Sequence, residues 1–178
     1  MAYSSLAACI IDLEKNGQLV RVKEEVDPYL EMAAIHLRVH ENKGPALFFE
    51  RVKGSKFPAV SNLFGTLDRS KFIFRDTIEH VKALIDLKMD PLEPIKHPLK
   101  YLSALPAAFS AWPMKSKFHR PVSYGHCQIN DLPQIVHWPM DGGPFVTLPQ
   151  VYTEDIELPG IWHANLGMYR IQLGGNEY

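Results

Sequence analysis

The sequence is poor in cysteine, with Cys9 and Cys127 as the two thiols among 178 residues. They stand far apart and belong to no paired spacing such as C-x-x-C. Small secreted domains need several regularly spaced cysteines, whereas thiols stay reduced in the cytoplasm. The sequence therefore argues against a disulfide framework, and we expect a cytoplasmic protein in which both thiols are free.

Long hydrophobic runs and clusters of basic residues are also lacking. No stretch approaches the roughly 18 consecutive apolar residues of a membrane span, and the apolar run near the N-terminus lacks the basic residues that precede it in a signal peptide. The formal net charge is -1, and no basic patch is present that could bind the phosphates of a nucleic acid. We therefore expect neither a membrane span nor a nucleic-acid partner.

The N-terminal half begins with the pattern of a helix followed by a strand. Hydrophobic content of 46% with 22% charged residues is typical of a globular protein. Ser5 is a favoured residue at the start of a helix, and Asn16-Gly17 is a favoured pair at its end. Residues 18–26 then alternate apolar and charged side chains, which predicts a strand with one solvent-exposed face.

A second helix and two strands are predicted next. Asp27 followed by Pro28 is typical of a helix start, with Asp27 as the cap and Pro28 as the first helical residue, and this helix should end near Gly44. Residues 45–52 and 57–63 are short apolar runs joined by a turn-forming sequence of lysine, glycine and serine. They predict two neighbouring strands that form a hairpin.

A proline-rich segment divides the chain. Short helices are predicted at residues 67–74 and from Thr77 onward. Between residues 89 and 121, prolines follow one another too closely for a long regular element, which predicts a linker with a domain boundary near residue 115. Residues 1–115 should therefore form an N-terminal α/β (α+β) domain.

Strand-like segments follow this boundary, at residues 122–129, 145–152 and 161–173. Clusters of asparagine, aspartate, glycine and proline separate them, as is typical of turns between strands. No fourth strand is evident. Residues 116–178 are therefore predicted to form an incomplete β-rich domain.

Several polar features of the second half favour no particular chemistry. His119, His126 and His137 are dispersed, and His126 adjoins Cys127. No C-x-x-C or H-x-x-x-H spacing accompanies them, and adjacent strand residues point to opposite faces, so we do not predict a zinc site. Residues 140–144 contain two glycines but lack the Lys-Ser/Thr pair of a phosphate-binding loop.

Polar residues interrupt the apolar pattern of residues 161–173. Asn165 offers an amide oxygen that can bind a hard cation, Gly167 permits close approach of a ligand to the backbone, and Arg170 carries a permanent planar cation. On an unbroken strand, Asn165, Gly167 and Tyr169 share one face. From residue types alone, an ordinary edge strand and a ligand site are both consistent with this segment.

The segment from Asn165 to Arg170, Asn-Leu-Gly-Met-Tyr-Arg, resembles the N-x-G-[IM]-Y-R signature of the UbiD-like decarboxylases, the 3-polyprenyl-4-hydroxybenzoate decarboxylase family. Other segments resemble that family in the same order, and together they cover essentially the whole chain. They are residues 13–19, 26–31, 44–50 and 60–66, the triplet His137-Trp138-Pro139 and the pair Gly143-Pro144.

The resemblance implies an enzyme of three parts: an N-terminal α/β domain, a split β-barrel related to flavin reductases, and a C-terminal domain that makes oligomers. The barrel would hold prenylated FMN, which serves as the electron sink while an aromatic or α,β-unsaturated carboxylic acid loses carbon dioxide. The expected fold class is therefore an α/β (α+β) N-terminal domain followed by the first strands of a split β-barrel flavin-binding domain.

The signature also implies roles for individual residues. Asn165 would bind the divalent metal, Mn2+, that bridges the protein and the cofactor phosphate, with K+ nearby. Arg170 would be the catalytic residue, whose charge can stabilise a carboxylate and hold a nearby glutamate ionised. The cofactor-binding residues implied by the resemblance are Thr147, Asn165, Gly167, Met168, Tyr169 and Arg170.

The resemblance covers about the first third of such an enzyme. The remaining metal ligands of the family, a histidine and a glutamate, follow the signature. We therefore expect a truncated chain, a fragment that does not decarboxylate by itself. For the full-length enzyme, the expected partners are the acid substrate, including the polyprenyl-4-hydroxybenzoate of quinone biosynthesis, a flavin prenyltransferase that supplies the cofactor, and further copies of the chain in a homo-oligomer.

Two other interpretations remain. The chain could be a binding module that pairs with a separate chain carrying the rest of the site. It could also be a flavin-binding protein similar to flavin reductases, although the asparagine and the arginine would then have no evident task.

Overall fold

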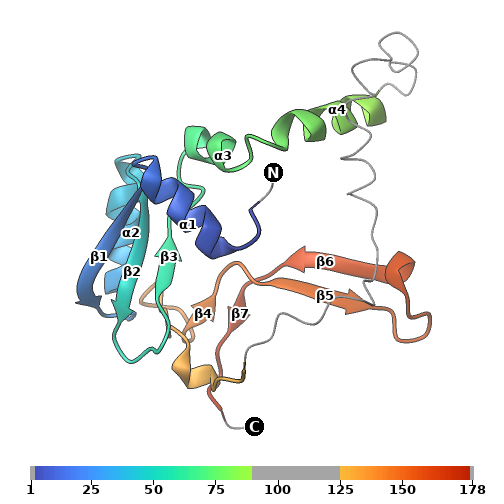
Figure 1. Cartoon of the computed structure of the whole chain (residues 1–178). Coiled ribbons are helices and arrows are strands. Elements are labelled where there is room, and N and C mark those ends of the chain that lie inside the picture. Colours follow the sequence, from blue (N-terminus) through green and yellow to red (C-terminus); the bar gives the residue numbers. More distant parts are fainter. Residues whose placement is uncertain (1–2, 90–124, 177–178) are drawn as a thin grey trace.

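The computed structural model describes residues 3–89 and 125–176. Within these ranges, a three-stranded sheet with its helices precedes two short β-ribbons (Figure 1). The expected linker and the domain boundary near residue 115 lie outside the described residues. None of the helices in the described ranges has the length and apolar character that a membrane crossing requires.

The first helix, α1, spans Leu6–Lys15 and begins and ends where the sequence predicts. The Ser5 hydroxyl oxygen accepts a hydrogen bond of 3.2 Å from a backbone N–H of the first turn. Gly17 follows the helix with φ +66, a left-handed conformation that glycine adopts at little cost. The helix buries one apolar face, formed by Cys9, Ile10 and Leu13.

The sheet has the order β1-β2-β3. Its strands are β1 (Leu19–Val26), β2 (Ala46–Val52) and β3 (Ala59–Ser61). The first two pair in parallel, with helix α2 (Glu31–Glu41) as the connection between them, and β3 returns antiparallel to β2 as the predicted hairpin. The mixed α/β character predicted for this half is confirmed.

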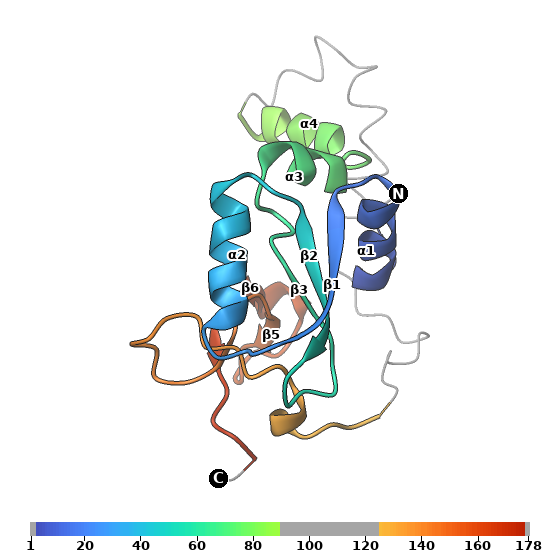
Figure 2. The ribbon, with the colours of Figure 1, turned by 90° about the vertical axis from the view of Figure 1, so that its left-hand side faces the viewer.

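Helices cover both faces of the sheet (Figure 2). On one face, Leu19 and Ala46 pack with the buried residues of α1. On the other face, Leu47 and Phe49 pack with Met32 of α2. Because successive strand residues point to opposite faces, the continuous apolar run of β2 supplies both hydrophobic clusters.

Helix α2 spans Glu31–Glu41 and starts later than Asp27-Pro28 predicts. The Asp27 carboxylate accepts a hydrogen bond of 2.9 Å from the backbone N–H of Tyr29, which makes a turn in place of a helix cap. Residues 28–30 are also held by a distant segment, since Leu30 N–H donates to the Val136 carbonyl and Val136 N–H to the Pro28 carbonyl, each at 3.1 Å. This long-range pairing keeps them out of the helix.

Two further helices follow the sheet, α3 (Leu67–Ile73) and α4 (Ile78–Met89), close to the predicted segments. Between β3 and α3 the chain is fixed by Arg69, which is 4% exposed. Its guanidinium donates hydrogen bonds to three backbone carbonyls, those of Leu63 at 3.0 Å, Gly44 at 3.0 Å and Asn62 at 2.7 Å. Burial lowers the pKa of this arginine.

The predicted strand at 122–129 is wrong where the structure describes it. Residues 125–128 form no strand, and Ile129–Asp131 form a short 3-10 helix, η1. The Asp131 carboxylate accepts a hydrogen bond of 3.1 Å from the Gln128 N–H, which closes this turn from both ends. The turn that separates this segment from the next therefore begins at Ile129, within the predicted strand.

The two other predicted strands, 145–152 and 161–173, exist but are each broken. Two ribbons result: β4 (Phe145–Val146) pairs with β7 (Ile171–Gln172), and β5 (Gln150–Glu154) pairs with β6 (Ala164–Met168). Residues 161–163 form a second 3-10 helix, η2. These ribbons are small sheets of the kind expected for the second half, and closure into a split barrel stays a prediction.

The break has a physical cause. The link between β4 and β5 has three residues, 147–149, whereas the link between β6 and β7 has two, 169–170. The pairing register therefore differs by one residue between the two ribbons. Pro149 has no N–H to continue the ladder, and its carbonyl accepts the Tyr169 N–H at 3.1 Å. This irregularity resembles a bulge, which bends a ribbon and redirects side chains.

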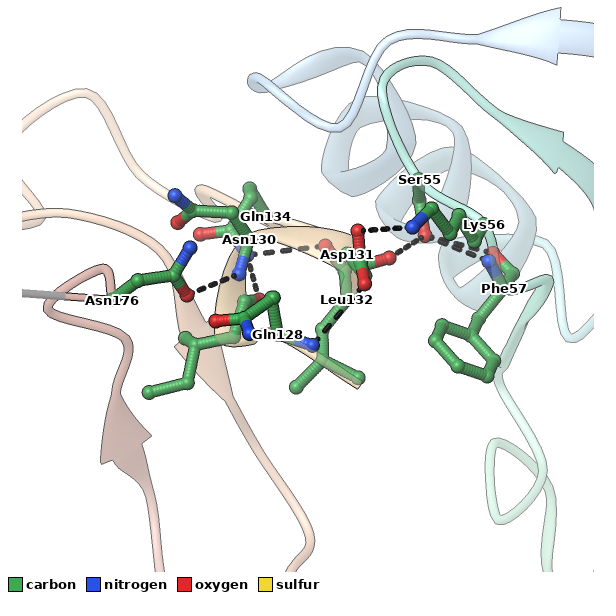
Figure 3. A network of polar contacts seen from close by, with 10 residues as sticks. Ser55, Lys56, Phe57, Gln128, Asn130, Asp131, Leu132, Gln134 and Asn176 are labelled. Carbon is green, nitrogen blue, oxygen red and sulfur yellow. Dashed lines mark hydrogen bonds and ion pairs between the residues drawn. The ribbon is translucent and has the colours of Figure 1, made fainter. Parts of the chain in front are cut away.

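A polar network joins the first half of the protein to the second (Figure 3). The Asp131 carbonyl accepts hydrogen bonds from the Ser55 hydroxyl at 2.9 Å and the Lys56 N–H at 3.0 Å, and the Asp131 carboxylate pairs with the Lys56 ammonium at 3.0 Å. In the middle of η1, the Asn130 N–H donates a hydrogen bond to the Asn176 side-chain oxygen at 3.2 Å. The β2–β3 hairpin therefore positions η1 and, through Asn176, the C-terminal end of the described chain.

Candidate functional site

Asn165 and Gly167 share one face of strand β6, as alternation along a strand predicts, and the side chain of Tyr169, the residue after the strand, lies against both. The Asn165 amide nitrogen lies 3.4 Å from the Tyr169 hydroxyl oxygen. The Tyr169 ring covers Gly167 so closely that a Cβ at that position would stand 2.7 Å from Cε2 of the ring. The glycine is therefore needed by the protein's own tyrosine, and a ligand that approached Gly167 directly would have to displace that ring.

Asn165 can offer a metal its amide oxygen, because its recorded contact with Tyr169 uses the nitrogen. A hard divalent cation takes several oxygen ligands. Within residues 3–89 and 125–176, however, no group of three or more His, Cys, Asp or Glu side chains is arranged to hold a metal. The amide oxygen of Asn165 has the chemistry of a Mn2+ ligand.

Arg170 lies at the break between β6 and β7. Its guanidinium donates a hydrogen bond of 2.6 Å to the Asp141 carboxylate and stacks 3.6 Å above the Phe145 ring centroid. The arginine side chain is 43% exposed and that of Asp141 12% exposed. Asp141 and Phe145 thus fix the orientation of the guanidinium, while part of it faces solvent. An anion can bind to that exposed part.

The sequence indicates only an ordinary turn at Asp141, and the role of this residue is visible in the structure alone. Burial of the Asp141 carboxyl opposes its ionisation, but the hydrogen bond and charge of Arg170, together with backbone N–H groups, prevail and lower its pKa. It also accepts the Trp138 N–H at 3.3 Å. Asp141 therefore fixes both the turn and the direction of Arg170.

Thr147 lies in the break opposite Tyr169 and Arg170, and its surroundings differ from theirs. It lines a cavity of about 700 Å³ that is formed by α2, by β3 and the loop after it, and by residues 135–148. None of Asn165, Gly167, Met168, Tyr169 or Arg170 lines this cavity. The structure thus brings Asn165, Gly167 and Tyr169 together, ties Arg170 to Asp141, and places Thr147 elsewhere.

Three histidines, His36, His40 and His137, line the same cavity, and none of them was predicted from the sequence as a site residue. His36 and His40, one helical turn apart on α2, stack with ring centroids 5.9 Å apart. His36 Nδ1 hydrogen-bonds to the Ser61 hydroxyl, and His40 Nδ1 lies 3.3 Å from the Asn62 side-chain oxygen. The spacing of four residues on a helix was the signal that could have revealed them.

Two family models match the chain. Residues 10–88 match the 3-octaprenyl-4-hydroxybenzoate carboxy-lyase N-terminal domain, and residues 114–178 match the 3-octaprenyl-4-hydroxybenzoate carboxy-lyase Rift-related domain. The second match contains every site residue predicted from the sequence. The two matches occur in the same order as in the family resemblance described above.

Relatives share this similarity over nearly the whole chain. A protein of Chlamydia muridarum is 40% identical over 171 residues, which are 94% of this chain and 29% of that protein. A protein of Chlamydia pneumoniae, named as one subunit of a 4-hydroxybenzoate decarboxylase, is 40% identical over 157 residues, 87% of this chain and 26% of that protein. The chain thus spans less than a third of the length of these relatives.

Solved structures agree with the sequence comparisons. The closed form of the vanillic acid decarboxylase of Sedimentibacter hydroxybenzoicus has a TM-score of 0.70 at 27% identity, covering 99% of this chain and 36% of that one. The UbiD-class enzyme HmfF of Pelotomaculum thermopropionicum, solved in complex with FMN, has a TM-score of 0.63 at 26% identity, covering 96% of this chain and 35% of that one. With both family models matched in order, the chain belongs to the UbiD family of 3-octaprenyl-4-hydroxybenzoate carboxy-lyases.

Proposed function

We propose that the chain supplies the N-terminal part of a non-oxidative decarboxylase that uses prenylated FMN and acts on an aromatic or α,β-unsaturated carboxylic acid. The observation that carries the proposal is the Asn165–Arg170 segment, which presents an amide oxygen and a directed guanidinium within a stretch that matches the family. HmfF structures in complex with FMN and with prFMN support the cofactor class. Further strands would complete the split barrel around β4 to β7.

Each residue of the proposed site has a task that its chemistry allows. Asn165 would bind Mn2+, and K+ would lie near it. Arg170 would bind and orient the carboxylate of the substrate, because its planar fork matches a carboxylate with two hydrogen bonds. When bound, the cofactor would supply the electron sink. The remaining contacts to it would come from Thr147, Gly167, Met168 and Tyr169.

The described residues include the types of group that this site needs, but too few of them to form it. One amide oxygen cannot hold Mn2+ alone, and Tyr169 covers the glycine that the cofactor would approach. We therefore expect the 178-residue chain to be inactive by itself. The rest of the metal site would come from polypeptide that corresponds to the other two thirds of the relatives.

Metal-dependent retention of a flavin tests this proposal. FMN and prenylated FMN, each with and without MnCl2, would be measured by equilibrium dialysis against the chain mixed with the downstream two thirds of a UbiD-family enzyme. We expect retention by the mixture that Mn2+ strengthens and that Asn165→Ala abolishes, and no retention by the chain alone. Asn130→Ala, an exposed asparagine on η1, is the matched control and should change nothing. Equal retention by mixtures that contain Asn165→Ala and the unchanged chain would contradict the proposal.

A second candidate function is that of one component in a complex of different chains. The relative from Chlamydia pneumoniae is named as one subunit of a decarboxylase, and the vanillic acid decarboxylase is described as ShVdcCD, with ShVdcD as a separate chain. Several large apolar side chains of the β5–β6 ribbon are exposed, among them Leu166 and Met168. Size-exclusion mass with and without a candidate partner would test this, and an unchanged mass would count against it.

A further inference from the structure

Helix α2 carries a histidine pair with the spacing H-x-x-x-H, which the histidines of the second half lack. His36 and His40 lie one turn apart on one face of the helix, and two histidines at this spacing can bind one zinc ion. Their rings are parallel to within 5°, with centroids 5.9 Å apart. Two imidazoles that share an ion through bonds of about 2.0–2.1 Å have centroids about 5–6 Å apart. A turn of each ring about its Cβ–Cγ bond, a soft torsion, would therefore aim one nitrogen of each at the same ion.

Hydrogen bonds at Nδ1 leave the other nitrogen of each ring for a metal. His40 Nδ1 lies 3.3 Å from Asn62 Oδ1, and the Asn62 amide nitrogen donates to the Pro45 carbonyl at 2.9 Å. Because Oδ1 can only accept, His40 Nδ1 carries the proton, and Nε2 of the neutral ring has a free lone pair. His36 Nδ1 is hydrogen-bonded to the Ser61 hydroxyl, which can accept in the same way. Histidines that bind metals typically donate their second ring N–H to such an oxygen, which fixes the ring.

Both rings can be reached by an ion. In the described part of the chain, His36 Nε2 makes no hydrogen bond, yet the atom that is buried there without a partner is His137 Nδ1 and not this one. His36 Nε2 therefore keeps accessible surface, although the residue as a whole is half-buried, and His40 is an exposed residue. Both histidines line the cavity of about 700 Å³ between α2 and residues 135–148. An ion that enters this cavity meets both of them.

The surroundings decide which class of ion fits. Among the described residues that line the cavity there is no Lys or Arg to repel a dication, and no Asp or Glu to offer it oxygen. Imidazole nitrogen suits zinc, copper and nickel, whereas carboxylate, carbonyl and water oxygens suit magnesium, calcium and manganese. No third His, Cys, Asp or Glu joins the pair within residues 3–89 and 125–176. Water would therefore fill the remaining positions around the ion.

We propose that His36 and His40 bind one divalent transition-metal ion of the zinc class through their Nε2 atoms, with Ser61 and Asn62 orienting the two rings. This site goes beyond the proposed function and requires no flavin. Its nitrogen ligands suit zinc, whereas the amide oxygen of Asn165 suits Mn2+, so the two sites respond to different metals. An ion held by two side chains one turn apart also stabilises the folded helix, because the unfolded chain does not keep the pair in place.

Two metals test the selectivity. The untagged chain, free of flavin, would be titrated at pH 7.5 with ZnCl2 and with MnCl2 by calorimetry, while NMR follows the ring nitrogens of the histidines. We expect saturable binding of Zn2+ that shifts the Nε2 resonances of His36 and His40, and binding of Mn2+ that is at least about tenfold weaker. Equal affinity for both metals, or unchanged Nε2 resonances of these two histidines at saturating Zn2+, would overturn the proposal.

Variants test the assigned residues. His36→Ala and His40→Ala each leave a single imidazole, and each should weaken Zn2+ binding at least about tenfold, the usual minimum cost of losing even an outer partner of a metal ligand. His126→Ala removes an exposed histidine outside the cavity and should leave the affinity unchanged. Ser61→Ala should weaken binding about tenfold, and Ser61→Thr, which keeps the hydroxyl, should restore it. Unaltered affinity in His36→Ala, or in His40→Ala if the former does not fold, would contradict the assignment.

Discussion

At the scale of single residues, Gly167 and Tyr169 show how the site depends on backbone space. The Tyr169 ring occupies the volume where any other residue at position 167 would place its Cβ. The ring also brings its hydroxyl to within 3.4 Å of the Asn165 amide nitrogen. Because that nitrogen faces the tyrosine, the amide oxygen is left for another partner.

Gly167→Ala should therefore displace the Tyr169 ring and destabilise the protein by about 1 kcal/mol, at the low end of the cost of overpacking, because that tyrosine is 46% exposed and its ring can move outward. The free energy of unfolding in urea measures this. In a Tyr169→Ala background the same substitution should cost much less, because the clash is gone. Gly174→Ala is the control, since a Cβ there meets nothing within 4 Å. An equal cost in both backgrounds would show that the ring is not the cause.

The neutral histidines predict a loss of stability in acid. Burial lowers the pKa of His36, helped by the charges of His40 and His137, and burial also lowers that of His137. The unfolded chain therefore binds more protons once the pH is below about 6.5. Stability should be fully present above that pH and should fall as the pH drops from there through the folded-state pKa values.

Urea unfolding at a series of pH values measures this loss. The double variant His36→Phe/His137→Phe should show a flatter pH dependence than the unchanged chain. His126→Phe, which replaces an exposed histidine, should keep the original slope. If the double variant were to lose stability in acid as steeply as the unchanged chain, these two histidines would not be responsible.

Sequence reasoning found the residues that form the signature but not those that hold them. The shared face of Asn165 and Gly167 on β6 follows from alternation along a strand and was predictable. The pairing of Arg170 with Asp141 depends on how a turn 29 positions earlier folds back. No local sequence pattern contains that information. The same holds for His36 and His137, which line one cavity although they lie far apart in the sequence.

At the scale of elements, buried Arg69 fixes the loop after β3, which forms one wall of the cavity that His36, His40 and His137 line. Its three hydrogen bonds to carbonyls of Gly44, Asn62 and Leu63 tie the start of β2 to the end of β3. No carboxylate is recorded as its partner in the described part of the chain. The charge is thus balanced by backbone dipoles alone, which makes its geometry important.

Arg69→Met should destabilise the protein by about 3 kcal/mol, because three buried or part-buried carbonyls lose the guanidinium donor. Arg69→Lys keeps the charge but cannot reach all three oxygens. Its stability should therefore lie between that of the unchanged protein and that of Arg69→Met. Arg38→Met, an exposed arginine on α2, is the control and should have little effect. Thermal or urea unfolding measures each change, and equal stability of Arg69→Met and Arg38→Met would contradict the structural role.

Helix and strand types were largely predictable, whereas their ends and interruptions were not. The apolar periodicity of α1 and the alternation of β1 need no partner to be recognised. The late start of α2 comes from pairing with Val136, and the breaks at residues 147–149 and 169–170 come from a one-residue shift between two ribbons. Both are tertiary events that override local propensity.

At the scale of the whole molecule, the two halves share one cavity and one polar joint. Backbone pairing of Pro28 and Leu30 with Val136, and the contacts of Ser55 and Lys56 with Asp131, hold them together. The proposed flavin and metal site lies on the ribbons of the second half. The chain spans 26% to 29% of the relatives from Chlamydia that it matches.

The central claim is that Asn165 and Arg170 belong to a decarboxylase site that this chain does not complete alone. The direct measurement is carbon dioxide release from 4-hydroxybenzoate with prenylated FMN and MnCl2, for the chain alone and for the chain mixed with the downstream two thirds of a UbiD-family enzyme. We predict no release by the chain alone, release by the mixture, and loss of that release in Asn165→Ala and Arg170→Ala. Turnover by the chain alone, or turnover by the mixture that neither substitution reduces, would contradict the claim.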